Sequence, residues 1–285
     1  MSSHSDHAVC LPAPVLRAFI TQYAGFRATR LPPRTHAGLP SRNVDLIISL
    51  GRPIEVIQMP NPAKSPATFA ALVSGLQGAP AVVRQSGDVC GLHVFLTPLG
   101  VRALLGVPSA EIASQVVELA DIWGRAAGGL IERLAEVHTW QERFAVLDRV
   151  FAGALKPVSP PCELSWAWRR LAQTRGCMPI QQLAGELGWS RRHFSERFRA
   201  ELGVTPKTAA RIFRFERACR LIMDERPSLA QVAFECGYHD QAHMTREWNA
   251  LAGSSPKAWI AGELPILQDY ELSGWDDEAR ERSPS

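Results

Sequence analysis

The octapeptide Gln182-Leu183-Ala184-Gly185-Glu186-Leu187-Gly188-Trp189 returns 49 residues later as Gln231-Val232-Ala233-Phe234-Glu235-Cys236-Gly237-Tyr238. A second match follows at an offset of 50, in which Phe194, Phe198, Gly203, Thr205 and Pro206 correspond to Met244, Trp248, Gly253, Ser255 and Pro256. Each copy combines an apolar helical segment, a glycine suited to a left-handed turn, a polar capping residue (Ser190 or Asp240) and a second amphipathic helix. The repeat therefore predicts two helix-turn-helix units.

The second copy is the more informative. Its Ala233, Gly237-Tyr238, Met244-Thr245-Arg246, Trp248, Gly253 and Ser255-Pro256 resemble the signature of AraC-family transcription regulators around their second recognition helix, with Trp248 where phenylalanine is usual. The resemblance covers about residues 163–262. It implies an all-α DNA-binding domain of seven helices, in which one long helix, here Thr208 to Met223, joins two units that enter successive major-groove segments.

Helical geometry predicts which side chains face DNA. At 100° per residue, Phe194, Phe198 and Leu202 share one face of the first recognition helix, and Met244, Trp248 and Leu251 share one face of the second. These faces must point into the core. The family's base-reading positions map onto the opposite faces, at Arg192, Ser195 and Glu196 in the first helix and Gln241, Ala242, Thr245 and Arg246 in the second.

The chemistry of these residues suits groove reading. Arginine can donate two parallel hydrogen bonds to guanine, glutamine can pair with adenine, and an alanine or threonine methyl can meet a thymine methyl. Glu196 has two interpretations: it accepts from cytosine, or it only pairs with Arg192 or Arg199. Arg191, Arg199 and Lys207 are predicted to hold phosphates, which sets register and salt dependence without reading sequence.

Charge is distributed unevenly along the chain. Residues 162–262 hold 15 Lys/Arg against 10 Asp/Glu, whereas residues 263–285 hold 2 against 7. Between Arg191 and Arg220 there are nine basic residues and three acidic ones. Such a stretch is either a solvated helix face or a surface that faces phosphates. Arg211, Arg214, Arg217 and Arg220 wind over half of the connecting helix, so at most one or two of them can reach DNA.

The chain of 285 residues is long enough for two domains. Pro157, Pro160 and Pro161 cannot continue a helix, so residues 157–162 are predicted to be a linker. Residues 1–156 are expected to form an α+β domain, strand-rich and then helical, and residues 263–285 an acidic, mobile tail. Within the first domain, Val44–Leu50 and Ile54–Ile57 flank Gly51-Arg52-Pro53 and suggest a hairpin. Leu92–Thr97 reads as a strand, and Pro98 begins a helix that ends near Gly106.

The first domain also resembles the uncharacterised N-terminal domains of many AraC-like regulators, through Tyr23-Ala24-Gly25-Phe26, His36 to Ser41 and Pro98 to Arg102. In better-studied relatives a barrel-like domain binds a small effector and its helices dimerise. Five residues could line such a pocket, although packing and capping are the alternative roles: Tyr23, Phe26, Arg34, His36 and His93.

Motifs of other function classes are missing from the sequence. The eight histidines show no metal-ligand spacing, and there is no nucleophile elbow, phosphate loop or dinucleotide fingerprint. We therefore expect no enzyme activity, metal or cofactor. The six cysteines are far apart and are expected to be reduced thiols. No apolar run approaches the roughly 20 residues of a membrane span, and no secretory signal is visible, so a cytoplasmic protein is expected.

The sequence therefore predicts a transcription regulator that binds promoter or operator DNA and does not associate with membranes. A small-molecule effector, RNA polymerase and a second copy of the chain are the other partners considered. The rival hypothesis is an effector-binding or antagonist protein whose helix-turn-helix pair contacts a protein. The arginines on the outward faces argue against it.

Overall fold

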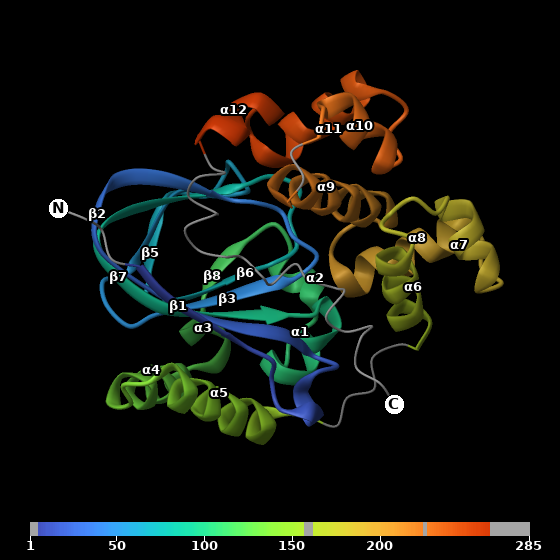
Figure 1. Ribbon diagram of the computed structural model, residues 1–285. Helices are drawn as coiled ribbons and strands as arrows, with labels where there is room; N and C mark the ends of the chain where they lie inside the picture. The colour runs from blue at the N-terminus through green and yellow to red at the C-terminus, as the bar shows by residue number, and fades with distance from the viewer. Residues whose placement is uncertain (1–4, 157–161, 225–226, 263–285) are drawn as a thin grey trace.

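The computed structural model describes residues 5–156, 162–224 and 227–262. The predicted linker, apart from Cys162, and the predicted acidic tail lie outside these residues. A strand-rich N-terminal domain is followed by an all-α C-terminal domain, as expected (Figure 1). No helix in the described part of the chain is both long enough and apolar enough to cross a membrane.

The N-terminal domain is built on one eight-stranded antiparallel sheet. Its strands follow the order β1-β2-β7-β3-β6-β8, with β4 paired to both β7 and β5. Their bounds are β1 Ser5–Cys10, β2 Ile20–Gly38, β3 Val44–Ser49, β4 Ile54–Gln58, β5 Ala67–Phe69, β6 Ala71–Ser74, β7 Ala81–Leu96 and β8 Val116–Glu118.

The long strands β2 and β7 dominate the sheet and bend near their middle. Register shifts fall between Ala28 and Leu31 and again before Arg34. Arg30 there has a positive φ of 57°, and its backbone N–H donates to Asp88 Oδ1 at 2.9 Å. Because bulges of this kind increase strand twist and bend, the far halves of β2 and β7 curl over with β4 and β5 into a half-open barrel (Figure 1).

The expected hairpin around Gly51-Arg52-Pro53 is wrong, because β3 and β4 do not pair with each other. Both run antiparallel to β7, β3 against its residues 91–96 and β4 against its residues 82–84. Two strands that are both antiparallel to a third run in the same direction, so they cannot form a hairpin. The Gly51–Pro53 segment instead interrupts one long pairing with β7.

Helices cover the face of the sheet that points away from the interior of the half-open barrel. Their bounds are α1 Pro98–Leu105, α2 Ser109–Ile112, α3 Leu119–Trp123, α4 Arg125–Glu136 and α5 Trp140–Ala154, with a 3₁₀ turn η1 at Pro14–Leu16. The strand predicted at 92–97 is the last part of the longer β7, which begins at Ala81 and ends at Leu96. The helix predicted from Pro98 to Gly106 is confirmed within one residue. Strand alternation points Val44, Leu46 and Ile48 into the apolar core that the sheet shares with these helices, where all three are fully buried.

The C-terminal domain contains seven helices among its described residues. They are α6 Cys162–Gln173, α7 Ile180–Glu186, α8 Arg191–Leu202, α9 Pro206–Asp224, α10 Leu229–Glu235, α11 Gln241–Ala252 and α12 Pro256–Gly262. The apolar core of α6 to α8 is continuous with that of the N-terminal domain, whereas α10 to α12 pack with one side of α9 in a separate core.

Candidate nucleic-acid interface

The first helix-turn-helix unit consists of α7 and α8. Gly188, with a φ of +69°, supplies the left-handed residue of the turn. Ser190 then caps α8, because its side-chain oxygen accepts a hydrogen bond from the His193 backbone N–H at 3.2 Å. The predicted inward residues Phe194, Phe198 and Leu202 are all fully buried. The predicted inward face of α8 is therefore confirmed.

The outward face of α8 carries the expected polar residues. Arg192 and Glu196 are exposed, and Arg192 Nε donates to Glu196 Oε1 at 2.9 Å across one helical turn. Ser195 beside them is half-buried. Of the two roles considered for Glu196, the structure contains the pairing with Arg192. Arg191 and Arg199 on the same helix are exposed, as is Lys207 in the first turn of α9.

The second unit consists of α10 and α11 and repeats this arrangement. Asp240 caps α11 by accepting from the His243 backbone N–H at 2.6 Å, and this bond lowers the pKa of the Asp240 carboxyl. Met244, Trp248 and Leu251 are fully buried, with Trp248 packed edge-on against Phe215 and Trp259. The predicted inward face of the second helix is confirmed as well.

The outward face of α11 presents Gln241, Ala242 and Arg246 to solvent, with Thr245 half-buried. No ion pair to the Arg246 side chain is formed within residues 5–156, 162–224 and 227–262. The two candidate base-reading arginines therefore differ. Arg192 is held by Glu196, whereas Arg246 is available to a ligand.

Glu247 is a structural residue that the sequence reasoning missed. Its carboxylate lies 3.2 Å from Arg211 Nε, 3.1 Å from Arg214 Nη2 and 3.4 Å from His243 Nε2. It therefore ties the second recognition helix to α9. The signal available in the sequence was an acidic residue next to an inward tryptophan, opposite a row of arginines spaced by three. Two of those arginines are engaged inside the protein, and Arg217 and Arg220 are half-buried.

The N-terminal domain holds both units from one side. Arg102 on α1 makes a bidentate ion pair with Glu201 on α8. Its Nε donates to Oε1 at 2.8 Å and its Nη2 donates to Oε2 at 2.9 Å. Gly203 has a φ of +79°, and a Cβ at this position would lie 2.2 Å from the Ala113 methyl, so only glycine allows α2 to approach α8 so closely. On the second unit, Leu39 packs against the separate core around α11.

The five expected effector-pocket residues divide into two groups. Phe26, His36 and His93 line a cavity inside the half-open barrel. Tyr23 does not: it is fully buried on the opposite face of the sheet, where its hydroxyl donates to Asp148 on α5 at 3.0 Å. The reason is strand alternation, which sends Tyr23 and Phe26 to opposite faces. Arg34 does not line the cavity either. Its Nε donates a hydrogen bond to the side chain of Gln85, which is a lining residue.

Two domain families match this chain. One, described as a helix-turn-helix domain, covers residues 183–262. The other, described as a domain of unknown function (DUF6597), covers residues 8–118. The second match ends with the last strand, β8, and the first lies wholly within the helical C-terminal domain.

Known proteins resemble the chain in sequence or in fold. The MmsAB operon regulatory protein of Pseudomonas aeruginosa is 30% identical over 82 residues, which are 29% of this chain and 27% of that protein, so the match spans about a quarter of its length. The crystal structure of an apo ToxT variant from Vibrio cholerae strain SCE256 is 12% identical and covers 84% of this chain and 97% of its own, with a TM-score of 0.51. The DNA-binding domain of the global transcriptional factor AdpA, solved with a target DNA, is 24% identical over 39% of this chain and 97% of its own, with a TM-score of 0.34.

Proposed function

Because the chain carries the paired helix-turn-helix units of the AraC family of transcription regulators and belongs to that family, we propose that it binds duplex DNA sequence-specifically, with one recognition helix in each of two successive major-groove segments. The chain is a DNA-binding transcription regulator. The residues that read bases and the way binding is controlled are our proposals.

The observation that carries this proposal is the arrangement of α8, α9 and α11. Both recognition helices bury one apolar face and turn a polar face to solvent, and α9 connects them. A helix of 19 residues spans about 28 Å at 1.5 Å per residue. One turn of B-DNA is about 34 Å, so this spacing suits two successive major-groove segments on one side of the duplex.

The assignment of roles follows exposure and partners. Arg246, Gln241, Ala242 and Thr245 on α11, and Arg192, Ser195 and Glu196 on α8, are the proposed base-reading residues. We assign Arg192 and Glu196 a joint role, because their ion pair orients the guanidinium along the helix face. Arg191, Arg199 and Lys207 flank these positions and are exposed, which suits contacts to phosphates.

Selection of bound sequences from a random DNA pool tests this function. A two-unit reader should enrich sites with two conserved blocks whose centres lie about 10 to 10.5 base pairs apart. Competition with scrambled duplex at several salt concentrations would then separate specific from nonspecific binding. Recovery of no common sequence, with only weak and salt-sensitive binding, would favour the rival in which the helix-turn-helix pair contacts a protein.

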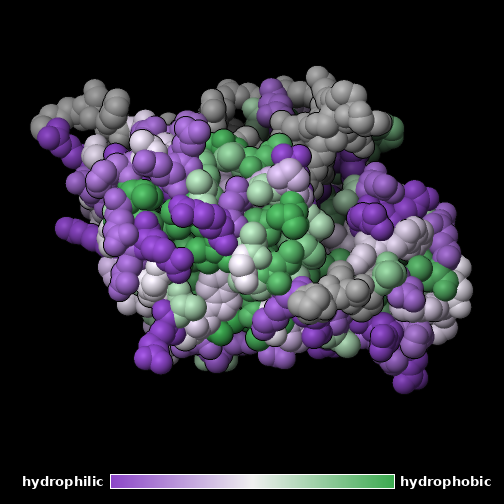
Figure 2. Space-filling model, turned by 90° about the horizontal axis from the view of Figure 1, so that it is seen from below, coloured by the Kyte–Doolittle hydropathy of each residue, from purple (hydrophilic) through white to green (hydrophobic). Residues whose placement is uncertain are grey.

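We also propose control by the N-terminal domain, through an effector in the barrel cavity and through self-association. Seen from the side of α4 and α5, the surface shows hydrophobic side chains gathered toward its middle (Figure 2). Leu11 and Val15, in the segment that packs beside α5, are 51% and 56% exposed. Val15→Glu should reduce dimer formation in sedimentation experiments. Phe234→Glu, which changes an 85% exposed side chain on α10, is the matched control and should not.

A further inference from the structure

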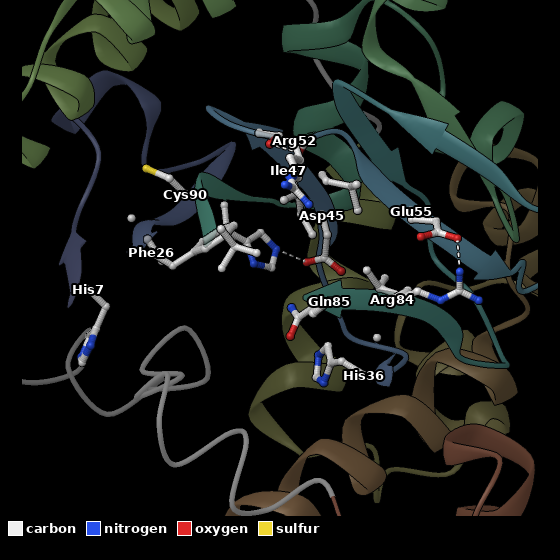
Figure 3. Close-up of a pocket in the computed structure, with 18 of the residues that line it drawn as sticks. His7, Phe26, His36, Asp45, Ile47, Arg52, Glu55, Arg84, Gln85 and Cys90 are labelled. Atoms are coloured by element: carbon white, nitrogen blue, oxygen red, sulfur yellow. Dashed lines mark hydrogen bonds and ion pairs between the residues drawn. The ribbon is translucent and has the colours of Figure 1, made fainter. Parts of the chain in front are cut away.

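The cavity of the N-terminal domain lies on the concave face of the curled sheet (Figure 3). Its volume is about 370 Å³, within the roughly 300 to 1,000 Å³ of pockets that hold small organic ligands. The lining comes from β1, β2, β3, β4 and β7, together with the segment that follows β2. Alternation along the strands explains why it is separate from the core: Asp45 and Ile47 face the cavity while their neighbours face the helices.

Most of the cavity wall is apolar and includes flat rings. Phe26, Ile47, Val83 and Phe95 contribute to it. The imidazole of His93 stacks on Phe95, with ring centroids 3.7 Å apart and an angle of 25° between the planes. A planar ligand can therefore lie against ring faces and branched aliphatic side chains. Such a wall favours aromatic ligands, because they bury a large apolar surface and can stack on the rings.

Three carboxylates belong to the wall, those of Asp45, Glu55 and Asp88. Arg84 Nη1 donates to Glu55 Oε1 at 2.7 Å, and His93 Nε2 lies 2.9 Å from Asp45 Oδ1 (Figure 3). Arg52 lies at the rim and is exposed, so water screens its charge. A ligand carboxylate would lie close to these three carboxylates, so the wall disfavours a negatively charged ligand.

Asp45 provides the polar recognition element. Among the described residues, His93 is the partner that bonds to its side chain, so its second carboxylate oxygen can accept from a ligand. A carboxylate accepts hydrogen bonds and cannot donate them when ionised. A ligand that satisfies this oxygen needs an N–H or O–H group.

We propose that this cavity binds an aromatic compound without a negative charge, about two fused rings in size, whose N–H or O–H group donates to Asp45. The proposal rests on the effector control proposed above and gives that effector a chemical class. Occupancy can be communicated to the DNA-binding domain through the cavity wall itself. Gly38, Leu39 and Ser41 line the cavity, and Arg42 in the same segment bonds to Glu216 on α9.

Three matched probes test the ligand class on the full-length chain by isothermal titration calorimetry in the absence of DNA. Indole carries a ring N–H, 1-methylindole has the same rings without the donor, and indole-3-carboxylate carries a negative charge. Indole should bind tightest, and each of the other two should bind at least about tenfold more weakly. Tighter binding of indole-3-carboxylate, equal binding of indole and 1-methylindole, or no heat from any probe would overturn the proposal.

Variants locate the binding. Asp45→Ala should weaken the binding of indole to the level of 1-methylindole and leave the binding of 1-methylindole unchanged. Asp88→Asn changes a carboxylate at another lining position and should keep the preference for indole over 1-methylindole. Ile47→Trp should fill the cavity and remove binding of both neutral probes. If Asp45→Ala keeps the preference, or if a folded Ile47→Trp protein still binds indole, the inferred site is wrong. Because these titrations contain no DNA, their outcome is independent of whether operator binding is found.

Discussion

The carboxylate of Glu216 on α9 accepts two hydrogen bonds from Arg42 of the N-terminal domain, one from the backbone N–H at 2.6 Å and one from the guanidinium. Glu216 is fully buried, and the Arg42 guanidinium also lies over the Phe213 ring, 4.7 Å from its centroid. An ion pair removed from water in this way joins the N-terminal domain to the helix that sets the spacing of the two recognition helices.

Removal of Arg42 alone should be costly. Arg42→Met leaves the Glu216 carboxylate buried without its counter-charge, for which we expect a loss of about 3 to 5 kcal/mol, whereas replacing both partners with apolar residues is often close to neutral. The variant Arg42→Met with Glu216→Leu should therefore regain most of the lost thermal stability. Melting temperatures of the wild type, both single variants and the double variant complete the cycle. A double variant no more stable than Arg42→Met would contradict this description of the contact.

The same carboxyl makes stability depend on pH. Burial raises the pKa of Glu216, and the neighbouring Arg42 offsets part of this effect. A carboxyl whose pKa is higher in the folded than in the unfolded chain binds protons more readily when folded, so its contribution to stability falls as pH rises from about 4.5 through the raised value. In urea unfolding between pH 4.5 and 7.5, the stability of wild type relative to Glu216→Gln should decrease with pH. An increase would mean that Arg42 outweighs burial.

Separation of the domains is a third test. Residues 157–285 alone should fold, because α9 to α12 have a core of their own, and should retain specific binding. We expect the fragment to be less stable than the full chain, because it loses the Arg102–Glu201 pair and the packing of α2 against Gly203. Circular dichroism and mobility shifts on a selected site measure both properties. A folded monomer that binds every sequence alike would refute the assignment of specificity to this domain.

The buried aromatic residues of the recognition helices should matter through stability. Phe194→Ala or Trp248→Ala removes a fully buried ring, at a cost of about 3 to 5 kcal/mol, and should abolish binding through unfolding. Trp248→Phe should cost much less, because the buried Trp248 Nε1 has no hydrogen-bond partner among the described residues and phenylalanine removes that unsatisfied donor. Loss of DNA binding by either alanine variant at unchanged melting temperature would show that the helix faces are reversed.

The sequence was most informative where short-range rules act. The repeat located both units, the caps Ser190 and Asp240 and the inward faces around Phe194 and Trp248, because helical period and capping chemistry are local. It could not provide the pairing of β3 and β4 with one long strand, which depends on the bend in β7. Nor could it predict the Arg42–Glu216 pair, whose residues are 174 positions apart, or the pairing of Glu247 with Arg211 and Arg214, which lie on another helix. Tyr23 was misplaced because a resemblance does not specify which face of a strand a residue occupies.

The sharpest prediction separates base reading from phosphate binding. Arg246 is exposed on the face of α11 opposite Trp248, so it should enter the major groove, where a two-pronged contact to guanine discriminates by about 1 to 3 kcal/mol. Arg246→Ala should weaken binding to the cognate site and relax preference at one or two base pairs, with little change in nonspecific affinity. Arg199→Ala should weaken binding to all sequences alike. It should also reduce by about one the slope of the logarithm of the binding constant against the logarithm of the salt concentration.

Both variants need measurement on cognate and scrambled duplexes at several salt concentrations, with thermal melts to show that each remains folded. Arg192→Ala gives a useful comparison, since it also releases Glu196, whose unpaired carboxylate would then repel phosphates near the groove. The double variant Arg192→Ala with Glu196→Gln should therefore bind the cognate site more tightly than Arg192→Ala alone. If Arg246→Ala instead lowers affinity equally on every duplex, the second unit is a backbone anchor, and specificity resides mainly in the helix that carries Arg192.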